Sequence, residues 1–195
     1  MNNYTFVDLE TRSKTDLRTC AAWRYSEDSD ADVICIAAAE DNTPVEATRP
    51  EKMRLPLAAD SVYVARNVFF EYAMFSNVLI PKYYYPKELR DVRRWICTAA
   101  LSRMHGLPAS LEASAEYLNK RFKKLPDGKR LIQLYCVPKK DGTFRPIPPD
   151  DWQKMLEEFW RDFKPKAGEV MEQKPSDVTA ALDDFLSPWL FPDKG

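Results

Sequence analysis

Apolar and polar positions alternate in short blocks along the first hundred residues of the chain. Several blocks are rich in β-branched and aromatic residues and are bounded by charged or turn-forming residues, which is the pattern of buried strands. The predicted strands are Tyr4–Leu9, Asp32–Ala39, Ser61–Ala65 and Trp95–Cys97.

Helical spacing dominates the rest of the chain. Asn67 is a candidate N-cap for an apolar helix over Val68–Ile80, which we expect Pro81 and Pro86 to interrupt. Thr98 is a candidate cap for a helix after the fourth strand. Further helices are predicted at Ser110–Arg121, Lys129–Val137, Asp150–Phe163 and Ser176–Leu186. Because strands come first and helices follow, we expect an α/β or α+β domain whose sheet comes mainly from the N-terminal half.

Two scarce residue types narrow the chemistry. The chain has one histidine, His105, and five glycines, of which Gly106 is the first. The first hundred residues therefore hold neither a Walker phosphate loop nor a glycine-rich dinucleotide turn. A zinc site with several histidines is excluded, and a serine or cysteine nucleophile system would have to use His105.

The cysteines and the hydropathy of the chain point to a reduced compartment. The four cysteines are far apart and form no C-x-x-C pair, which argues against metal or redox use. Without a recognisable signal segment, we expect a cytoplasmic location. No apolar run approaches the roughly 20 residues that span a bilayer, so we expect no membrane association.

Charge is distributed unevenly behind a net charge of −1. Residues 1–119 carry a net charge of −3, residues 120–145 carry +7, and residues 146–195 carry −5. The basic stretch of 26 residues is typical of a surface that contacts phosphates. The alternative is a solvated basic loop.

Two pairs of polar residues are candidates for metal chemistry. Asp8 and Glu10 are two apart in the first predicted strand and therefore share one of its faces. Such like charges repel unless a cation neutralises them, and an all-oxygen ligand set favours Mg²⁺ or Mn²⁺. Asn67 and Glu71 share one face of the helix that follows the third strand. The alternatives are an exposed acidic strand end and a capped surface helix with an ordinary glutamate.

A family resemblance rests on two longer strings, FVDLETRSKTDLRTCAAWRYSEDSDADVICIA and ARNVFFEYAMF. They resemble the 3′–5′ exonuclease domain attached to phage-type family A DNA polymerases, a DEDD exonuclease. The resemblance continues through RWICTAALSRMHGLPASLEASAEYL, KKLPDGKRLI and DDWQKMLEEFWRDF. It implies an α/β, RNase H-like exonuclease fold with a mixed central sheet flanked by helices over residues 1–165. Residues 166–195 are then expected to form a C-terminal helix and tail that packs on this domain or docks a partner.

The resemblance implies roles for the carboxylates. Asp8 and Glu10 match the first exonuclease motif, and Glu71 matches the carboxylate of the second. The residue before Asn67 is often His in the family and is Arg66 here. The family's third motif has a Tyr, or in another branch a His, shortly before a last Asp.

That third motif departs from the family pattern in this chain. The helix register places Asp162 at the Asp position, with Glu158 where the Tyr should be. Asp177 is the other candidate, with Gln173 at the Tyr position. No tyrosine follows Tyr135, so both known forms of the motif are missing.

The resemblance further implies a two-metal hydrolysis of single-stranded DNA 3′ ends, with two Mg²⁺ or Mn²⁺ ions held by Asp8, Glu10 and Asp162. The chain would act alone or as the proofreading part of a split phage polymerase. The alternatives are a weakened exonuclease-like module that binds DNA or protein, and a preference for RNA. Predicted nucleic-acid contacts are Arg66, Asn67, Lys123, Lys124, Lys129 and Arg130.

Overall fold

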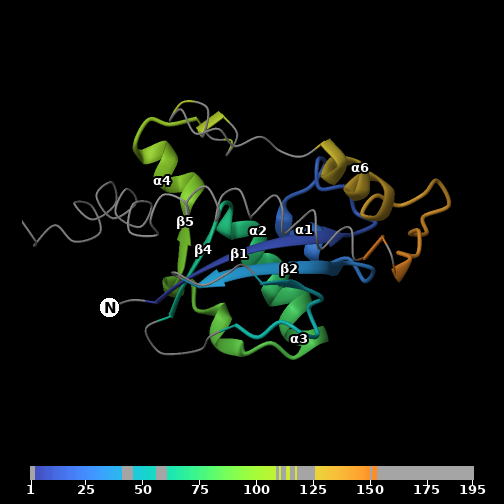
Figure 1. The fold of residues 1–195 in the computed structure, drawn as a ribbon, viewed down its shortest axis with the longest axis horizontal. Helices are drawn as coiled ribbons and strands as arrows, with labels where there is room; N and C mark the ends of the chain where they lie inside the picture. The colour runs from blue at the N-terminus through green and yellow to red at the C-terminus, as the bar shows by residue number, and fades with distance from the viewer. Residues whose placement is uncertain are drawn as a thin grey trace, which may run out of the picture.

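The computed structural model describes residues 3–40, 46–55, 61–108, 110, 113–114, 117, 126–149 and 151–152. Its centre is a sheet in the strand order β3-β2-β1-β4-β5 (Figure 1). The strands are β1 (Asn3–Arg12), β2 (Asp32–Glu40), β3 (Glu46–Thr48), β4 (Ser61–Ala65) and β5 (Trp95–Cys97). All four predicted strands are confirmed, and β3 is an additional one.

The sheet is mixed. β1, β2 and β3 pair antiparallel, whereas β4 runs parallel to both β1 and β5. Parallel pairing needs a crossover connection. The helices between β4 and β5 supply it for that pair, whereas the chain passes through β2 and β3 before β4 returns beside β1. This mixed five-stranded sheet with helices places the chain in the α/β class and is compatible with an RNase H-like fold.

The helical elements are mostly short. The α-helices are α1 (Ala22–Ser26), α2 (Val68–Met74), α3 (Ile80–Tyr83), α4 (Thr98–Met104) and α6 (Pro126–Tyr135). A π-helix covers Phe75–Leu79, and 3₁₀-helices cover Lys87–Arg90 and Val92–Arg94. In Figure 1, α6 lies beside the end of β1, whereas α4 lies at the side of β5.

The helix after β4 continues through Pro81, contrary to the sequence prediction. A proline lacks an N–H group, and its ring collides with the carbonyl four residues earlier. Here the π-helical turn over Phe75–Leu79 comes directly before, and Pro81 sits in the first turn of α3. The wider π turn displaces the hydrogen-bond ladder, so the helical path runs on to Tyr83. Pro86 follows its end and starts a 3₁₀-helix.

The main core lies between the sheet and one layer of helices. Val7 and Leu9 of β1 are buried in it together with Val33 and Ile36 of β2. The helical side of this core includes Met74, Phe75, Val78 and Leu79. A smaller cluster joins Ile34 to Leu131, Tyr135 and Cys136, so α6 packs against the start of β2.

Other helix predictions have mixed outcomes. Thr98 is the first residue of α4 rather than its cap, because Cys97 holds the extended cap position. The helix predicted at Lys129–Val137 is confirmed as α6, which starts earlier, at Pro126. The helices predicted at Ser110–Arg121 and Asp150–Phe163 lie largely outside the described residues, and the helix at Ser176–Leu186 lies there entirely, as does the tail 166–195.

Candidate functional site

Two carboxylates project from the middle of β1. Val7 and Leu9 are buried in the main core, so the alternating Asp8 and Glu10 lie on the opposite face, where both are half-buried. Their cross-strand neighbours on β2 are Ala37 for Asp8 and Cys35 for Glu10. Both of these small side chains are fully buried. The predicted shared face of Asp8 and Glu10 is therefore confirmed, whereas their metal-binding roles stay predictions.

Glu71 lies on α2, the helix that follows β4, and β4 is the neighbour of β1 in the sheet. β4 pairs with β1 only along Asn3–Phe6, and the chain then leaves the sheet and enters α2. Glu71 falls in the first turn of α2 and is only 5% exposed. Its Oε2 atom has no hydrogen-bond partner among the described residues. A buried carboxylate oxygen without a partner is rare and calls for an explanation.

The ionisation of Glu71 reflects this environment. Burial, which disfavours the charged form, raises the pKa of Glu71 to about 8, and repulsion by the Asp8 carboxylate adds to the increase. Asp8 and Glu71 are therefore close enough to interact electrostatically. An isolated Glu71 holds its proton near neutral pH, whereas a cation beside it would favour the ionised form.

The other carboxylate, Glu10, acts electrostatically on two buried thiols and one buried phenol. The Glu10 carboxylate contributes to raised pKa values of Cys35, of Cys136 and of Tyr25, although burial is the main cause in each case. The pKa of Cys136 rises to about 12, so this thiol is neutral. No local pattern predicts these neighbours, because Cys136 is far from Glu10 along the chain and comes near it through the packing of α6 on β2.

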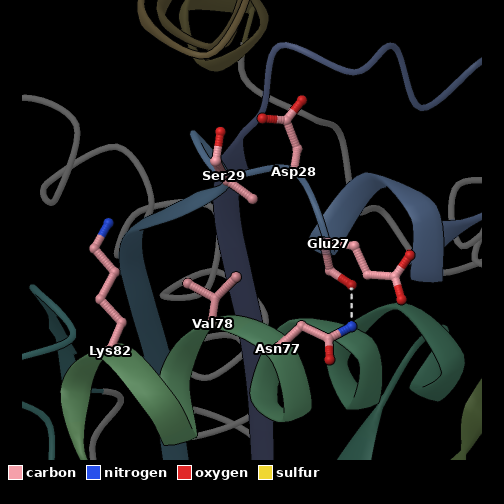
Figure 2. Close-up of a pocket in the computed structure, with 8 residues that line it drawn as sticks. Glu27, Asp28, Ser29, Asn77, Val78 and Lys82 are labelled. Carbon is pink, nitrogen blue, oxygen red and sulfur yellow. Dashed lines mark hydrogen bonds between the residues drawn. The ribbon is translucent and has the colours of Figure 1, made fainter.

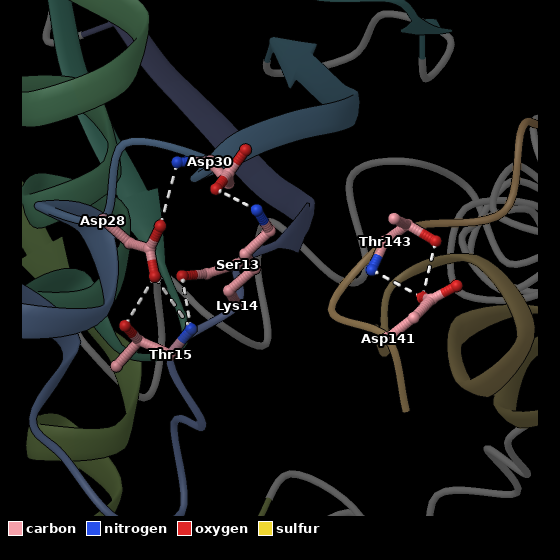
Figure 3. A network of polar contacts seen from close by, with 7 residues as sticks. All are labelled: Ser13, Lys14, Thr15, Asp28, Asp30, Asp141 and Thr143. Atoms are coloured by element: carbon pink, nitrogen blue, oxygen red, sulfur yellow. Dashed lines mark hydrogen bonds and ion pairs between the residues drawn. The ribbon is translucent and has the colours of Figure 1, made fainter. Parts of the chain in front are cut away.

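The strand end behind Glu10 is fixed by a polar network (Figure 3). Ser13 Oγ donates to the carbonyl of Tyr25, while the amide and hydroxyl of Thr15 donate to Asp28 at 2.9 and 2.6 Å. These donors lower the pKa of Asp28. Thr11 and Tyr25 also share a hydrogen bond of 3.0 Å. The loop after β1 is thus tied to the loop before β2, which holds the position of Glu10.

A complete metal cluster is not assembled within the described ranges. There, no group of three or more His, Cys, Asp or Glu side chains is arranged to hold an ion. The candidates for the last ligand, Asp162 and Asp177, lie outside the described residues, as do Lys123 and Lys124. The oxygen donors that are described, and above all the orphaned Oε2 of Glu71, nevertheless fit a hard divalent cation.

Asn67 and Arg66 stand at the entrance to α2 but differ in exposure. Asn67 holds the predicted N-cap position, yet its side chain makes no capping hydrogen bond and is exposed. Arg66 turns inward: its guanidinium donates to Thr98 O at 3.2 Å and to Ser102 Oγ at 2.8 Å, and it also bonds Ser114 Oγ at 3.2 Å. Contact of Arg66 with nucleic acid stays a prediction, and these bonds give it a structural role.

We expect Arg66→Ala to lower the free energy of unfolding by about 1–3 kcal/mol, because it leaves partly buried acceptors such as Thr98 O without their donor. Urea denaturation measures the loss. Arg93→Ala is the matched control, because Arg93 is exposed and its ion pair among the described residues is a surface contact with its neighbour Asp91. Equal losses in the two variants would contradict the anchoring role.

Of the basic segment, residues 120–145, the structure describes residues 126–145. Arg130 is exposed on α6, and Lys129 lies in the same helix, although its side chain is outside the described part. Tyr135 is buried in the smaller cluster and donates its hydroxyl to Asp151. Nucleic-acid contact by this segment stays a prediction.

A larger pocket, of about 340 Å³, lies away from these carboxylates (Figure 2). It is lined by the loop after α1 and by the π-helix and α3, and Asn77 closes one side by donating to Ser26 Oγ at 2.8 Å. Its lining contains none of Asp8, Glu10 and Glu71. We therefore assign the candidate site to the carboxylates and not to this pocket.

Comparisons with known proteins point toward DNA. The chain is 29% identical over 168 residues to a DNA polymerase of Bacillus phage SP02, a match that covers 76% of this chain and 24% of the polymerase. It is also 73% identical over 45 residues to DNA topoisomerase 1 of Zymomonas mobilis, covering 23% of this chain and 4% of that protein. The chain thus corresponds to a minor part of each relative.

No protein-family model and no solved structure matches the chain. Within the described ranges, every helix is too short or too polar to serve as a membrane span. The similarity to a phage polymerase fits a polymerase-associated domain. This agrees with the resemblance of the sequence to a domain attached to phage-type polymerases.

Proposed function

We propose that this chain is a metal-dependent 3′–5′ exonuclease that removes nucleotides from single-stranded DNA 3′ ends in association with a phage-type DNA polymerase. The observation that carries the proposal is the buried Oε2 of Glu71, which lacks a hydrogen-bond partner among the described residues. The Asp8 carboxylate is close enough to raise the pKa of Glu71, although burial is the main cause of that increase. The similarity to the SP02 polymerase supports the DNA substrate.

The proposed roles combine the positions of the described side chains with the family resemblance of the sequence. Asp8 and Glu10 would hold Mg²⁺ or Mn²⁺ together with a late aspartate, Asp162 or Asp177. The bound ions would supply a more acidic water and stabilise negative charge on the leaving oxygen. Glu71, on α2, completes the negative field from the second side, and Asn67 stands exposed one turn earlier on the same helix face.

The direction of degradation tests this proposal. With a single-stranded oligonucleotide labelled at its 5′ end, we expect a ladder of products that shorten by one nucleotide, because removal starts at the unlabelled 3′ end. A 3′ label should be released at once as a mononucleotide. Both results should require Mg²⁺ or Mn²⁺ and stop with EDTA. Products from internal cuts, or degradation that EDTA leaves unchanged, would contradict the proposal.

A second candidate function is a module that binds DNA or protein without efficient cleavage. It is favoured by the lack of any tyrosine after Tyr135, because the family uses a tyrosine or histidine in the third motif to orient the attacking water. Loss of such a positioning group typically costs about 10²–10⁴-fold in rate. Binding of single-stranded DNA without metal-dependent shortening in the same assay would favour this candidate.

A further inference from the structure

A second, smaller pocket lies at the end of the sheet beyond Glu10. It has a volume of about 140 Å³, which is room for a few water molecules and therefore for a phosphate group. Arg12 and Asp32, at the paired ends of β1 and β2, form one side. Arg49, which follows β3, and Trp152 form another side.

Arg49 is held in a fixed orientation within this pocket. Its guanidinium lies over the ring of Trp152, 4.2 Å from the ring centroid. Such cation–π stacking uses the flat face of the guanidinium and leaves its N–H edge available. None of the ion pairs found among the described residues involves Arg49. Its charge is thus available to a bound anion.

The acidic residue beside Arg49 is already neutralised. Asp32 forms ion pairs with Arg12 at 3.2 Å and with Lys82 at 2.7 Å. The hydroxyl of Tyr83 also donates a hydrogen bond to Asp32 at 2.7 Å. Glu51 also lines the pocket and is exposed. The lining thus holds two cationic and two anionic side chains, and Asp32 is further neutralised from outside the pocket by Lys82.

The pocket adjoins the candidate site along β1. Arg12 follows Glu10 by two residues, and a strand rises about 3.3 Å per residue, so Arg12 lies roughly 13 Å along the strand from Asp8. The side chains of Glu10 and Arg12 act in opposite directions on the pKa of the same buried thiol, Cys136. Both therefore lie near Cys136, and the pocket continues the line of the carboxylates.

We propose that this pocket binds a backbone phosphate of the DNA strand a few nucleotides upstream of its 3′ end, with Arg49 as the donor and Trp152 as the platform that orients it. The inference rests on the proposed exonuclease function, because it needs a strand whose 3′ end lies at Asp8 and Glu10. A planar, stacked guanidinium is well suited to bidentate contact with phosphate.

The test uses the full chain with Asp8→Asn and Glu10→Gln, in EDTA, so that the strand stays intact. Fluorescence anisotropy measures the affinity for a labelled dT₈ oligonucleotide over a range of salt concentrations. We expect Arg49→Gln to weaken binding about 3–10-fold and to reduce the slope of log affinity against log salt by about 0.7, the value for one lost phosphate contact to a single strand. Arg49→Lys should keep most of the slope, since it keeps the charge.

The controls separate the possible failures. Arg24→Gln removes an exposed charge on α1 and should leave affinity and slope unchanged. An unchanged slope for a folded Arg49→Gln variant would overturn the inference while the exonuclease function stands. If Arg49→Gln weakens the binding of dTMP as much as that of dT₈, the pocket is a mononucleotide site and the inference is wrong. If the Asp8→Asn, Glu10→Gln chain with Arg49 intact binds no single-stranded DNA, the proposed function fails as well.

Discussion

Replacing Asp8 by asparagine and Glu10 by glutamine in one variant should reduce the Mg²⁺-dependent shortening of single-stranded DNA by about 10³-fold or more. The two substitutions keep the shape of each side chain but remove both negative charges from the half-buried face of β1 that lies opposite the main core. Loss of a single preorganised electrostatic contact in an active site already costs about 10²–10³ in rate. Single-turnover assays with a 5′-labelled oligonucleotide measure the effect.

A charge-matched variant controls for this result. Glu27→Gln with Asp30→Asn also removes two negative charges, from an exposed loop whose side chains make only surface contacts. This control variant, Glu27→Gln with Asp30→Asn, should keep full nuclease activity. Because Asp8 repels Glu71, the site variant should be at least as stable as the parent chain, which thermal unfolding checks. Full nuclease activity in a folded Asp8→Asn, Glu10→Gln variant would contradict the assignment of Asp8 and Glu10 as metal ligands.

The stability of the metal-free chain should fall as the pH rises from about 4.5 to about 8, and Glu71→Gln should remove much of this dependence. The folded state raises the pKa of Glu71 from 4.5 to about 8, so it binds the Glu71 proton more tightly than the unfolded chain does. Unfolding then releases a proton within this window, and the free energy of unfolding decreases with pH. We expect a difference on the order of 2–4 kcal/mol between the ends of the window.

Chemical denaturation in EDTA at a series of pH values measures this slope. Glu71→Gln should be more stable than the parent chain at pH 8, since it buries a neutral amide of the same shape. Addition of Mn²⁺ at pH 8 should stabilise the parent chain more than the variant, because a cation relieves the repulsion between Glu71 and Asp8. A slope that is identical in the two proteins would show that Glu71 does not ionise in this window.

Much of the sheet was predictable because its strands are short, apolar and rich in β-branched residues. β3 was missed since Glu46–Thr48 has no such pattern and becomes a strand only by pairing with β2. The passage of the helix through Pro81 was missed for a related reason. A proline has a strong local effect, but the π-helical turn that accommodates it depends on packing and leaves no simple periodicity.

In the candidate site too, the contacts that follow from local sequence patterns were predictable, and those between distant segments were not. The shared face of Asp8 and Glu10 follows from strand alternation alone, and the place of Glu71 near them follows from helix spacing after a neighbouring strand. Local patterns do not reveal the inward turn of Arg66 toward α4 or the approach of Cys136 to Glu10. Those contacts join segments that are distant in the sequence, so only the folded chain brings them together.

The π-helical turn also sets the orientation of everything that follows it. A π turn holds one residue more than an α-helical turn, and one residue corresponds to a rotation of about 100°. Lys82 and Tyr83, in the turn of α3 that follows, each contact Asp32 at 2.7 Å. Deleting one residue from Phe75–Leu79 should rotate both side chains away from Asp32 and leave Arg12 as the cation paired with that carboxylate. A single inserted residue in a helix thus governs the charge balance at the far end of β1.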